Sequence, residues 1–117
     1  MQLRDVPLSF DDVETPFLLL DVKRALANLE RVRGAFAKLR PRIFYAAKAN
    51  NDPRLLAALH AAGCGFDVAS LNEIRHLQAL GVPAANLTFS ATVKLPGHIR
   101  EAHARGSTAS PSTTTLK

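Results

Sequence analysis

"RIFYAAKANND" occupies residues 42–52, and this stretch decides how the rest of the chain is interpreted. Its first half is rich in apolar and aromatic residues with little alternation, which is typical of a strand buried on both faces of a parallel sheet. Lys48 ends the apolar run, and a polar turn follows it. A lysine in this position is either an ordinary surface residue where a strand meets solvent or a group placed there for covalent chemistry.

The sequence on both sides of this stretch predicts an alternation of strands and helices. We expect strands at 15–21, 42–48, 65–69 and 87–91, and helices at 22–39, 54–62, 71–80 and 95–106. The connections are short and no strand is followed by a hairpin turn. This order is that of βα units around a parallel sheet, which places the chain in the α/β class.

Local signals mark where the helices begin and which face they bury. Asp21 is a typical N-cap for the first helix, and Ser70 and Glu73 form the S-x-x-E pattern of a capping box. The first helix carries apolar residues at spacings of three and four, which predict one buried face. These residues are Val22, Leu26, Leu29, Val32, Phe36 and Leu39.

The carboxyl ends of parallel strands are where such folds place ligands. Lys48 ends the second expected strand, Asp67 lies near the end of the third, and residues 90–92 end the fourth. Partial burial favours the free amine of a lysine, which then forms a Schiff base with an aldehyde such as pyridoxal phosphate. Asp67 could hold that lysine in place. Because lysines at strand ends are common, spacing alone leaves the surface interpretation open.

Composition limits the classes of protein that remain. The chain has 117 residues, with 47% apolar and 21% charged residues, which suits one small globular domain. The formal charge of +5 is spread over helix faces and mixed with acids, so we expect no nucleic-acid partner. The longest uncharged apolar run is too short for a bilayer, and the acidic N-terminus does not resemble a signal peptide. A single cysteine, Cys64, is expected in the core and fits a cytoplasmic protein. The histidines are scattered, so no metal site is predicted.

Three motifs in order carry a resemblance to a known family. They are "FYAAKAN" at 44–50, "GFDVAS" at 65–70 with Glu73 after it, and "LGVP" at 80–83. With them, the stretch from Thr15 to about Gly106 closely resembles the pyridoxal-phosphate decarboxylases of the ornithine/diaminopimelate/arginine type. These enzymes share the alanine-racemase-like barrel. The segment "FSATVK" is more similar to the ornithine branch.

The resemblance implies a fold and a site. The fold would be a partial TIM (β/α)8 barrel, about the first three of its βα units, since a whole barrel takes about 250 residues. Lys48 would form the Schiff base with pyridoxal 5'-phosphate, and Asp67 would be the family's active-site aspartate. Glu73 matches an acid close to that site, but its capping role explains it equally well. The reaction implied is decarboxylation of a basic amino acid such as ornithine, and the full-length family implies a homodimer.

The end of the chain changes composition abruptly. Residues 107–117, "STASPSTTTLK", have no periodic apolar pattern and are expected to be disordered. A reading-frame slip of one base gives a string compatible with the strand that the family places there. We therefore expect a leading segment at 1–21, the N-terminal part of the barrel at 22–106, and a frameshifted tail that truncates the enzyme.

Three functions are compatible with this sequence. The first is a decarboxylase fragment that is inactive alone. The second is another pyridoxal-phosphate enzyme of the same fold group, either a diaminopimelate decarboxylase or an amino-acid racemase. The third is a non-catalytic binding protein of decarboxylase shape, against which the presence of Lys48 argues.

Overall fold

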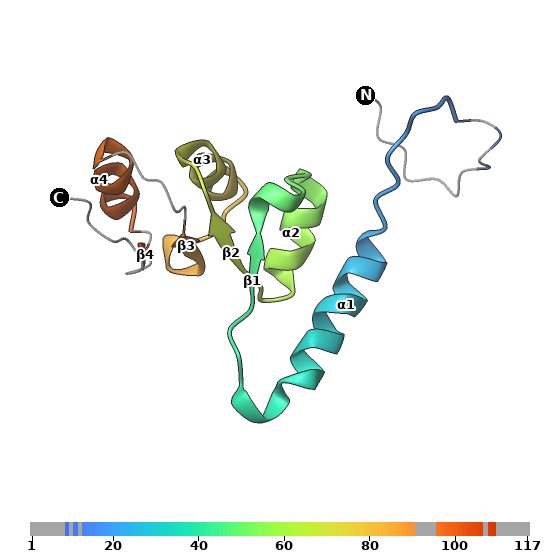
Figure 1. The fold of residues 1–117 in the computed structure, drawn as a ribbon, viewed down its shortest axis with the longest axis horizontal. Coiled ribbons are helices and arrows are strands. Elements are labelled where there is room, and N and C mark those ends of the chain that lie inside the picture. Colours follow the sequence, from blue (N-terminus) through green and yellow to red (C-terminus); the bar gives the residue numbers. More distant parts are fainter. Residues whose placement is uncertain (1–8, 10, 12, 91–95, 107, 110–117) are drawn as a thin grey trace.

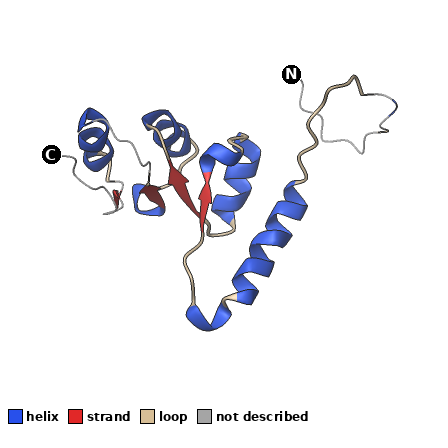
Figure 2. Cartoon of the chain, in the orientation of Figure 1, coloured by secondary structure: helices blue, strands red, loops and turns tan. Residues whose placement is uncertain are grey.

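The computed structural model describes residues 9, 11, 13–90, 96–106 and 108–109, in which helices and strands alternate (Figures 1 and 2). The helices are α1 (Val22–Ala35), α2 (Pro53–Ala61), α3 (Leu71–Ala79) and α4 (Pro96–Ala104). The strands are β1 (Phe44–Ala46), β2 (Gly65–Val68), β3 (Leu87–Phe89) and β4 (Thr108–Ala109). Three short 3₁₀ helices lie between them, η2 (Ala37–Leu39), η3 (Ala47–Ala49) and η4 (Ala84–Asn86).

The strands form one sheet in the order β1-β2-β3-β4, and every neighbouring pair is parallel. Ala46 lies beside Asp67, which in turn lies beside Thr88 on the next strand. Parallel neighbours connected through a helix are the repeating unit of a (β/α)8 barrel. The predicted α/β organisation and partial barrel are therefore confirmed.

The fourth strand comes from the segment that was expected to lack regular structure. Thr108 pairs with Thr88, and Ala109 pairs with Phe89. The expectation is wrong for these two residues, and the other residues of 107–117 lie outside the described ones. The positive φ of 79° at Gly106 ends the last helix and turns the chain back toward β3, whose free edge accepts a parallel neighbour.

The core lies between the sheet and the helices. Alternate strand residues are fully buried, namely Phe66 and Val68 on β2 and Leu87 and Phe89 on β3. They join buried leucines and isoleucine of α2 and α3 in one cluster: Leu55, Leu56, Leu59, Leu71, Ile74 and Leu77. The residues between them, Asp67 and Thr88, are only half-buried. The sheet therefore has one covered apolar face and one more open, more polar face.

Cys64 is a small core residue, as expected. Its side chain is 1% exposed, and its Sγ lies 3.4 Å from the carbonyl oxygen of Ile43. Burial raises the pKa of this thiol above its usual value.

Helix α1 begins where the sequence predicts but ends earlier. The Asp21 carboxylate accepts a hydrogen bond of 2.9 Å from the backbone N–H of Arg24, which confirms the N-cap. The helix stops at Ala35 instead of Leu39, and η2 follows it. Of the predicted apolar face only Leu29 is buried, while Val32, Phe36 and Leu39 are 44%, 52% and 76% exposed. The end of α1 therefore lacks the packing that would extend it.

The segment 15–21 does not form the buried strand that was predicted. No strand is assigned there, and Phe17, Leu18 and Leu19 are 43%, 78% and 61% exposed. A strand needs a neighbour to satisfy its backbone groups, and β1, at the edge of the sheet, does not pair with this segment.

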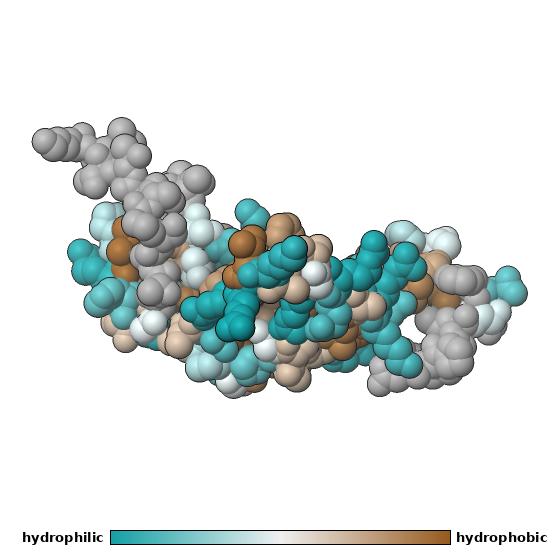
Figure 3. All heavy atoms as spheres, turned by 90° about the horizontal axis from the view of Figure 1, so that it is seen from below, coloured by the Kyte–Doolittle hydropathy of each residue, from teal (hydrophilic) through white to brown (hydrophobic). Residues whose placement is uncertain are grey.

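Helices of the described residues are all too short or too polar to cross a membrane. On the face shown in Figure 3, apolar residues are interspersed with polar ones along the molecule.

Candidate functional site

The candidate site lies at the carboxyl ends of the strands. Lys48 follows β1, Asp67 lies within β2, and Ser90 follows β3. Because the three strands are parallel and adjacent, all three residues lie at the same edge of the sheet. The backbone therefore places these three residues at the carboxyl ends of neighbouring strands, where the sequence predicts them.

Lys48 is not the last residue of a strand, as predicted, but lies in the single turn η3 that follows β1. Its neighbour Ala47 is 1% exposed and anchors this turn in the core. The Lys48 side chain is exposed, so the described part of the chain does not provide the partial burial that was expected around it. The amine is accordingly open to a ligand from solvent.

Two hydrogen bonds fix the backbone after Lys48. The Tyr45 hydroxyl donates to the carbonyl oxygen of Asn50 at 3.2 Å, and the Asn50 side-chain oxygen accepts from the N–H of Asp52 at 2.9 Å. Burial raises the pKa of Tyr45 above its usual value. The Asp52 carboxylate then caps α2 by accepting from the N–H of Arg54 at 2.9 Å.

Asp67 is half-buried on the open face of the sheet. Its Oδ1 accepts a hydrogen bond from the hydroxyl of Ser90 on the neighbouring strand. The sequence placed Ser90 at the end of a strand but gave it no role, because the pairing of these side chains depends on the register between β2 and β3.

Glu73 is part of the start of α3. Its backbone N–H donates to the Ser70 hydroxyl at 3.2 Å, and its Oε2 accepts from the N–H of Ala69 at 2.7 Å. The capping box is confirmed, with the difference that the glutamate bonds the residue before the cap and not the cap itself. The carboxylate therefore ties α3 to the end of β2, as an acceptor of a backbone hydrogen bond.

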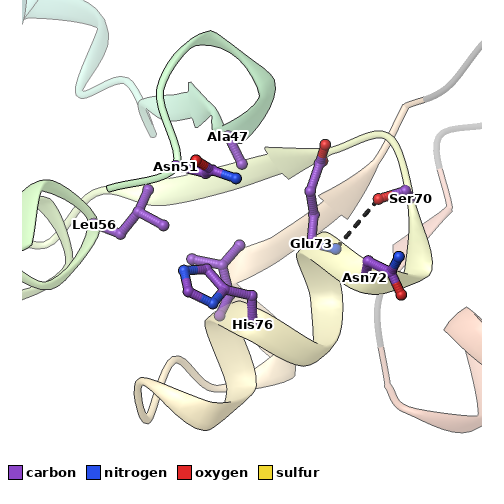
Figure 4. A pocket seen from close by; sticks show the side chains of 8 residues that line it. Ala47, Asn51, Leu56, Ser70, Asn72, Glu73 and His76 are labelled. Atoms are coloured by element: carbon purple, nitrogen blue, oxygen red, sulfur yellow. Dashed lines mark hydrogen bonds between the residues drawn. The ribbon is translucent and has the colours of Figure 1, made fainter. Parts of the chain in front are cut away.

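A pocket of about 420 Å³ lies beside this carboxylate, between η3, α2 and α3 (Figure 4). It is lined by Ala47, Asn51, Leu56, Ser70, Asn72, Glu73, His76 and Leu77. The buried Nε2 of His76 has no hydrogen-bond partner among the described residues. Asn51, Asn72 and His76 were not among the site residues predicted from the sequence. Glu73 and His76 are three residues apart, which places both on one face of the helix. This spacing is the sequence feature from which the pocket lining could have been predicted.

The structure does not bring all the candidates into contact. Asp67 pairs with Ser90, while Glu73 belongs to the pocket beside α3, which neither Lys48 nor Asp67 lines. Within the described residues, no hydrogen bond or ion pair joins Lys48 to either acid. The described residues also contain no cluster of three or more potential metal ligands.

The side chains present fit an aldehyde-bearing cofactor. A primary amine, the group that an aldehyde needs, is exposed at the edge where parallel folds bind ligands. A carboxylate stands on the neighbouring strand with one oxygen held by a hydroxyl. These groups would attach the cofactor and orient a positively charged nitrogen beside it.

Comparison with known proteins identifies this part of the chain. Residues 22–111 match the family described as "Pyridoxal-dependent decarboxylase, pyridoxal binding domain". An ornithine decarboxylase of Nicotiana glauca, described as chloroplastic, is 35% identical over 83 residues, which are 71% of this chain and 19% of the relative. The chain thus matches about a fifth of that relative's length.

Two solved structures share the fold. The lysine/ornithine decarboxylase of Vibrio vulnificus, complexed with putrescine, has a TM-score of 0.75 and 28% identity over 83% of this chain and 26% of that chain. The diaminopimelate decarboxylase of Helicobacter pylori, complexed with L-lysine, has a TM-score of 0.74 and 28% identity over 84% of this chain and 25% of that chain.

Proposed function

Since this chain belongs to the pyridoxal-dependent decarboxylases, we propose that it carries the lysine that anchors the cofactor of an amino-acid carboxy-lyase. The observation that supports this proposal most directly is the position of Lys48. Its amine is exposed in the turn after β1, at the carboxyl edge of a parallel sheet, inside the matched pyridoxal-binding domain. Lys48 is therefore the residue to which we assign covalent attachment of pyridoxal phosphate.

Bound pyridoxal phosphate supplies an aldehyde for the lysine and a ring that accepts the electrons left when a carboxylate departs. Lys48 would hold the cofactor through its amine nitrogen. Asp67, on the adjacent strand, provides a carboxylate that attracts the ammonium form of a lysine or of a substrate. Glu73 contributes by fixing the end of β2 to α3 through Ala69, and its charge adds to the negative potential near the site.

The substrate class is a basic amino acid, with ornithine preferred, which would give the polyamine precursor putrescine. The name of the curated relative supports this choice, because that relative is an ornithine decarboxylase. The chain matches only 19% of that relative's length, and we propose that it does not decarboxylate by itself. In the full-length enzyme, a homodimer would complete the site.

The test is to trap the cofactor with borohydride on the purified chain and map the labelled peptides. We expect the label on Lys48 and its loss in Lys48→Arg, which keeps the charge but removes the reactive amine. Lys38→Arg is the matched control, since Lys38 is an exposed lysine in η2, away from the strand ends. Equal labelling of Lys23, Lys38 and Lys48 would show that Lys48 is an ordinary surface lysine.

Two other functions remain distinguishable. A diaminopimelate decarboxylase or racemase would also label Lys48, whereas a non-catalytic binding protein of this shape would not. Ornithine, diaminopimelate and alanine can each be added to the loaded chain before borohydride. Under our proposal ornithine lowers the trapped fraction at Lys48 most, and a stronger effect of diaminopimelate or alanine would favour the other enzymes.

A further inference from the structure

The open face of the sheet carries one polar side-chain pair between neighbouring strands. Asp67 of β2 and Thr88 of β3 are register partners, and Ser90 lies two residues beyond Thr88, on the same face. The Ser90 hydroxyl donates to Oδ1 of Asp67. Among the described residues, no other donor reaches this carboxylate.

The backbone of Ser90 is held by the sheet, although the residue lies just beyond the end of β3. Its N–H donates to the carbonyl oxygen of Val68 at 3.3 Å, which continues the hydrogen bonding between β2 and β3 by one residue. Val68, which accepts this hydrogen bond, and Phe89, which precedes Ser90 in the chain, are each 1% exposed. The backbone of Ser90 is therefore held next to the core of the molecule, while its side chain is exposed on the open face.

A carboxylate that accepts one fixed hydrogen bond is restricted in rotation. With Oδ1 bound to the Ser90 hydroxyl, Oδ2 accepts no hydrogen bond from the described residues, and the side-chain torsions of Asp67 are limited to those that keep the Ser90 bond. The covered face of the sheet has no such polar pair among its buried strand residues, which are Phe66, Val68, Leu87 and Phe89.

We propose that Ser90 is a positioning residue that holds the Asp67 carboxylate in the orientation in which Oδ2 receives a cationic nitrogen at the site. This inference rests on the proposed function for the identity of that nitrogen, which is the Lys48 ammonium or the ammonium of a substrate. The hydrogen bond to Asp67 itself is a property of the chain without cofactor and is measured separately.

The first measurement is the side-chain rotamer of Asp67, from NMR scalar couplings, in the wild-type chain and in Ser90→Ala and Ser90→Thr. We expect one dominant χ1 rotamer in the wild type, rotamer averaging in Ser90→Ala, and restoration by Ser90→Thr, which keeps the hydroxyl. Circular dichroism should show the same helix content in all three proteins, since Ser90 lies outside the helices.

The second measurement is the rate at which pyridoxal phosphate attaches to Lys48, trapped with borohydride. Ser90→Ala should raise this rate about 3- to 10-fold, the value of one hydrogen bond to the carboxylate, because an ammonium held by the carboxylate does not attack the aldehyde. Asp67→Asn should raise it at least as much, and Ser90→Thr should bring it most of the way back to the wild-type rate. Ser9→Ala is the matched control, because Ser9 also donates to an aspartate, Asp11, at 3.3 Å, but outside the matched domain.

The outcomes separate the two proposals. An unchanged Asp67 rotamer in Ser90→Ala overturns the inference, whatever the labelling shows. A rate that rises in Asp67→Asn but not in Ser90→Ala also overturns it, while leaving the proposed function intact. If the wild type does not label at Lys48, the proposed function fails, and the rotamer measurement alone decides whether Ser90 positions Asp67.

Discussion

At the scale of single residues, Glu73 has a structural role that is independent of any chemistry. Its side chain accepts from the N–H of Ala69, and its own N–H donates to Ser70, so two backbone donors at the start of α3 are satisfied. The bonds join the last residues of β2 to the helix that follows. The glutamate therefore fixes the edge of the sheet at which Asp67 lies, even without contacting Asp67.

The two capping residues should respond differently to substitution. Ser70→Ala removes the acceptor of the Glu73 N–H and should lower the free energy of unfolding by about 1 kcal/mol. Glu73→Gln keeps an acceptor oxygen for the Ala69 N–H and should cost less, about 0.5 kcal/mol. Urea denaturation followed by circular dichroism measures both, with Ser9→Ala as a control for loss of an exposed hydroxyl. A larger loss in Glu73→Gln than in Ser70→Ala would show that the charge, and not the cap, is what matters.

Single residues also show what could be predicted from sequence. The caps at Asp21 and Ser70 follow local rules and were predicted, as was the position of Lys48 to within two residues of a strand end. The bond between Ser90 and Asp67 could not be predicted, because it depends on the register of two strands separated by a helix. The unpartnered His76 nitrogen depends in the same way on how α3 packs.

At the scale of elements, the prediction succeeded where local signals agreed with packing. Helices α2 and α3 have an N-cap and a glycine after their ends, at Gly63 and Gly81, both with positive φ. The prediction failed for the segment 15–21 and for the end of α1. Both have strong apolar patterns, but most of their large apolar side chains remain exposed, namely Phe17, Leu18 and Leu19 in the first and Val32, Phe36 and Leu39 in the second.

Two glycines in these elements should give opposite results when replaced by alanine. Gly34 lies in α1 and a Cβ there would meet nothing within 4 Å, so Gly34→Ala should stabilise the chain by about 0.5 to 1 kcal/mol. Gly65 opens β2, where a Cβ would lie 2.7 Å from the Phe44 ring and 3.1 Å from the Asn86 carbonyl oxygen. Gly65→Ala should therefore destabilise by about 1 to 3 kcal/mol.

The same urea titration measures both glycine variants. Gly34→Ala should raise the midpoint and Gly65→Ala should lower it, with an unchanged slope in each case. A neutral Gly65→Ala would mean that Phe44 and the turn before β3 move aside at no cost, and that β1 and β2 are not closely packed.

At the scale of the whole molecule, the sheet is covered on one face and is open at both edges of the described structure. Parallel sheets are normally covered on both faces, because helices connect their strands. Here α2 and α3 enclose the core, while Asp67 and Thr88 on the other face stay half-buried. The open face and the exposed residues at the end of α1 are places where a further surface could pack.

The exposed end of α1 predicts self-association of the chain. Val32 lies in the last turn of α1, Phe36 is its C-cap and Leu39 ends η2, and the side chains of all three are exposed. Covering a large apolar side chain stabilises by about 1.5 to 3 kcal/mol, so a second copy packed against this surface would be favoured as concentration rises. Sedimentation equilibrium should show an average mass that increases with protein concentration.

Substitution at the end of α1 and in η2 locates the surface responsible for this association. Phe36→Ser combined with Leu39→Ser should shift association to a higher concentration, since both side chains leave the contact. Ala27→Ser, at an exposed position in the first half of α1, is the control and should leave association unchanged. If the double variant associates like the wild type, the contact lies elsewhere. The open face of the sheet would then be the surface that a second copy covers, and Thr88→Lys, which places a charge on that face, should weaken association instead.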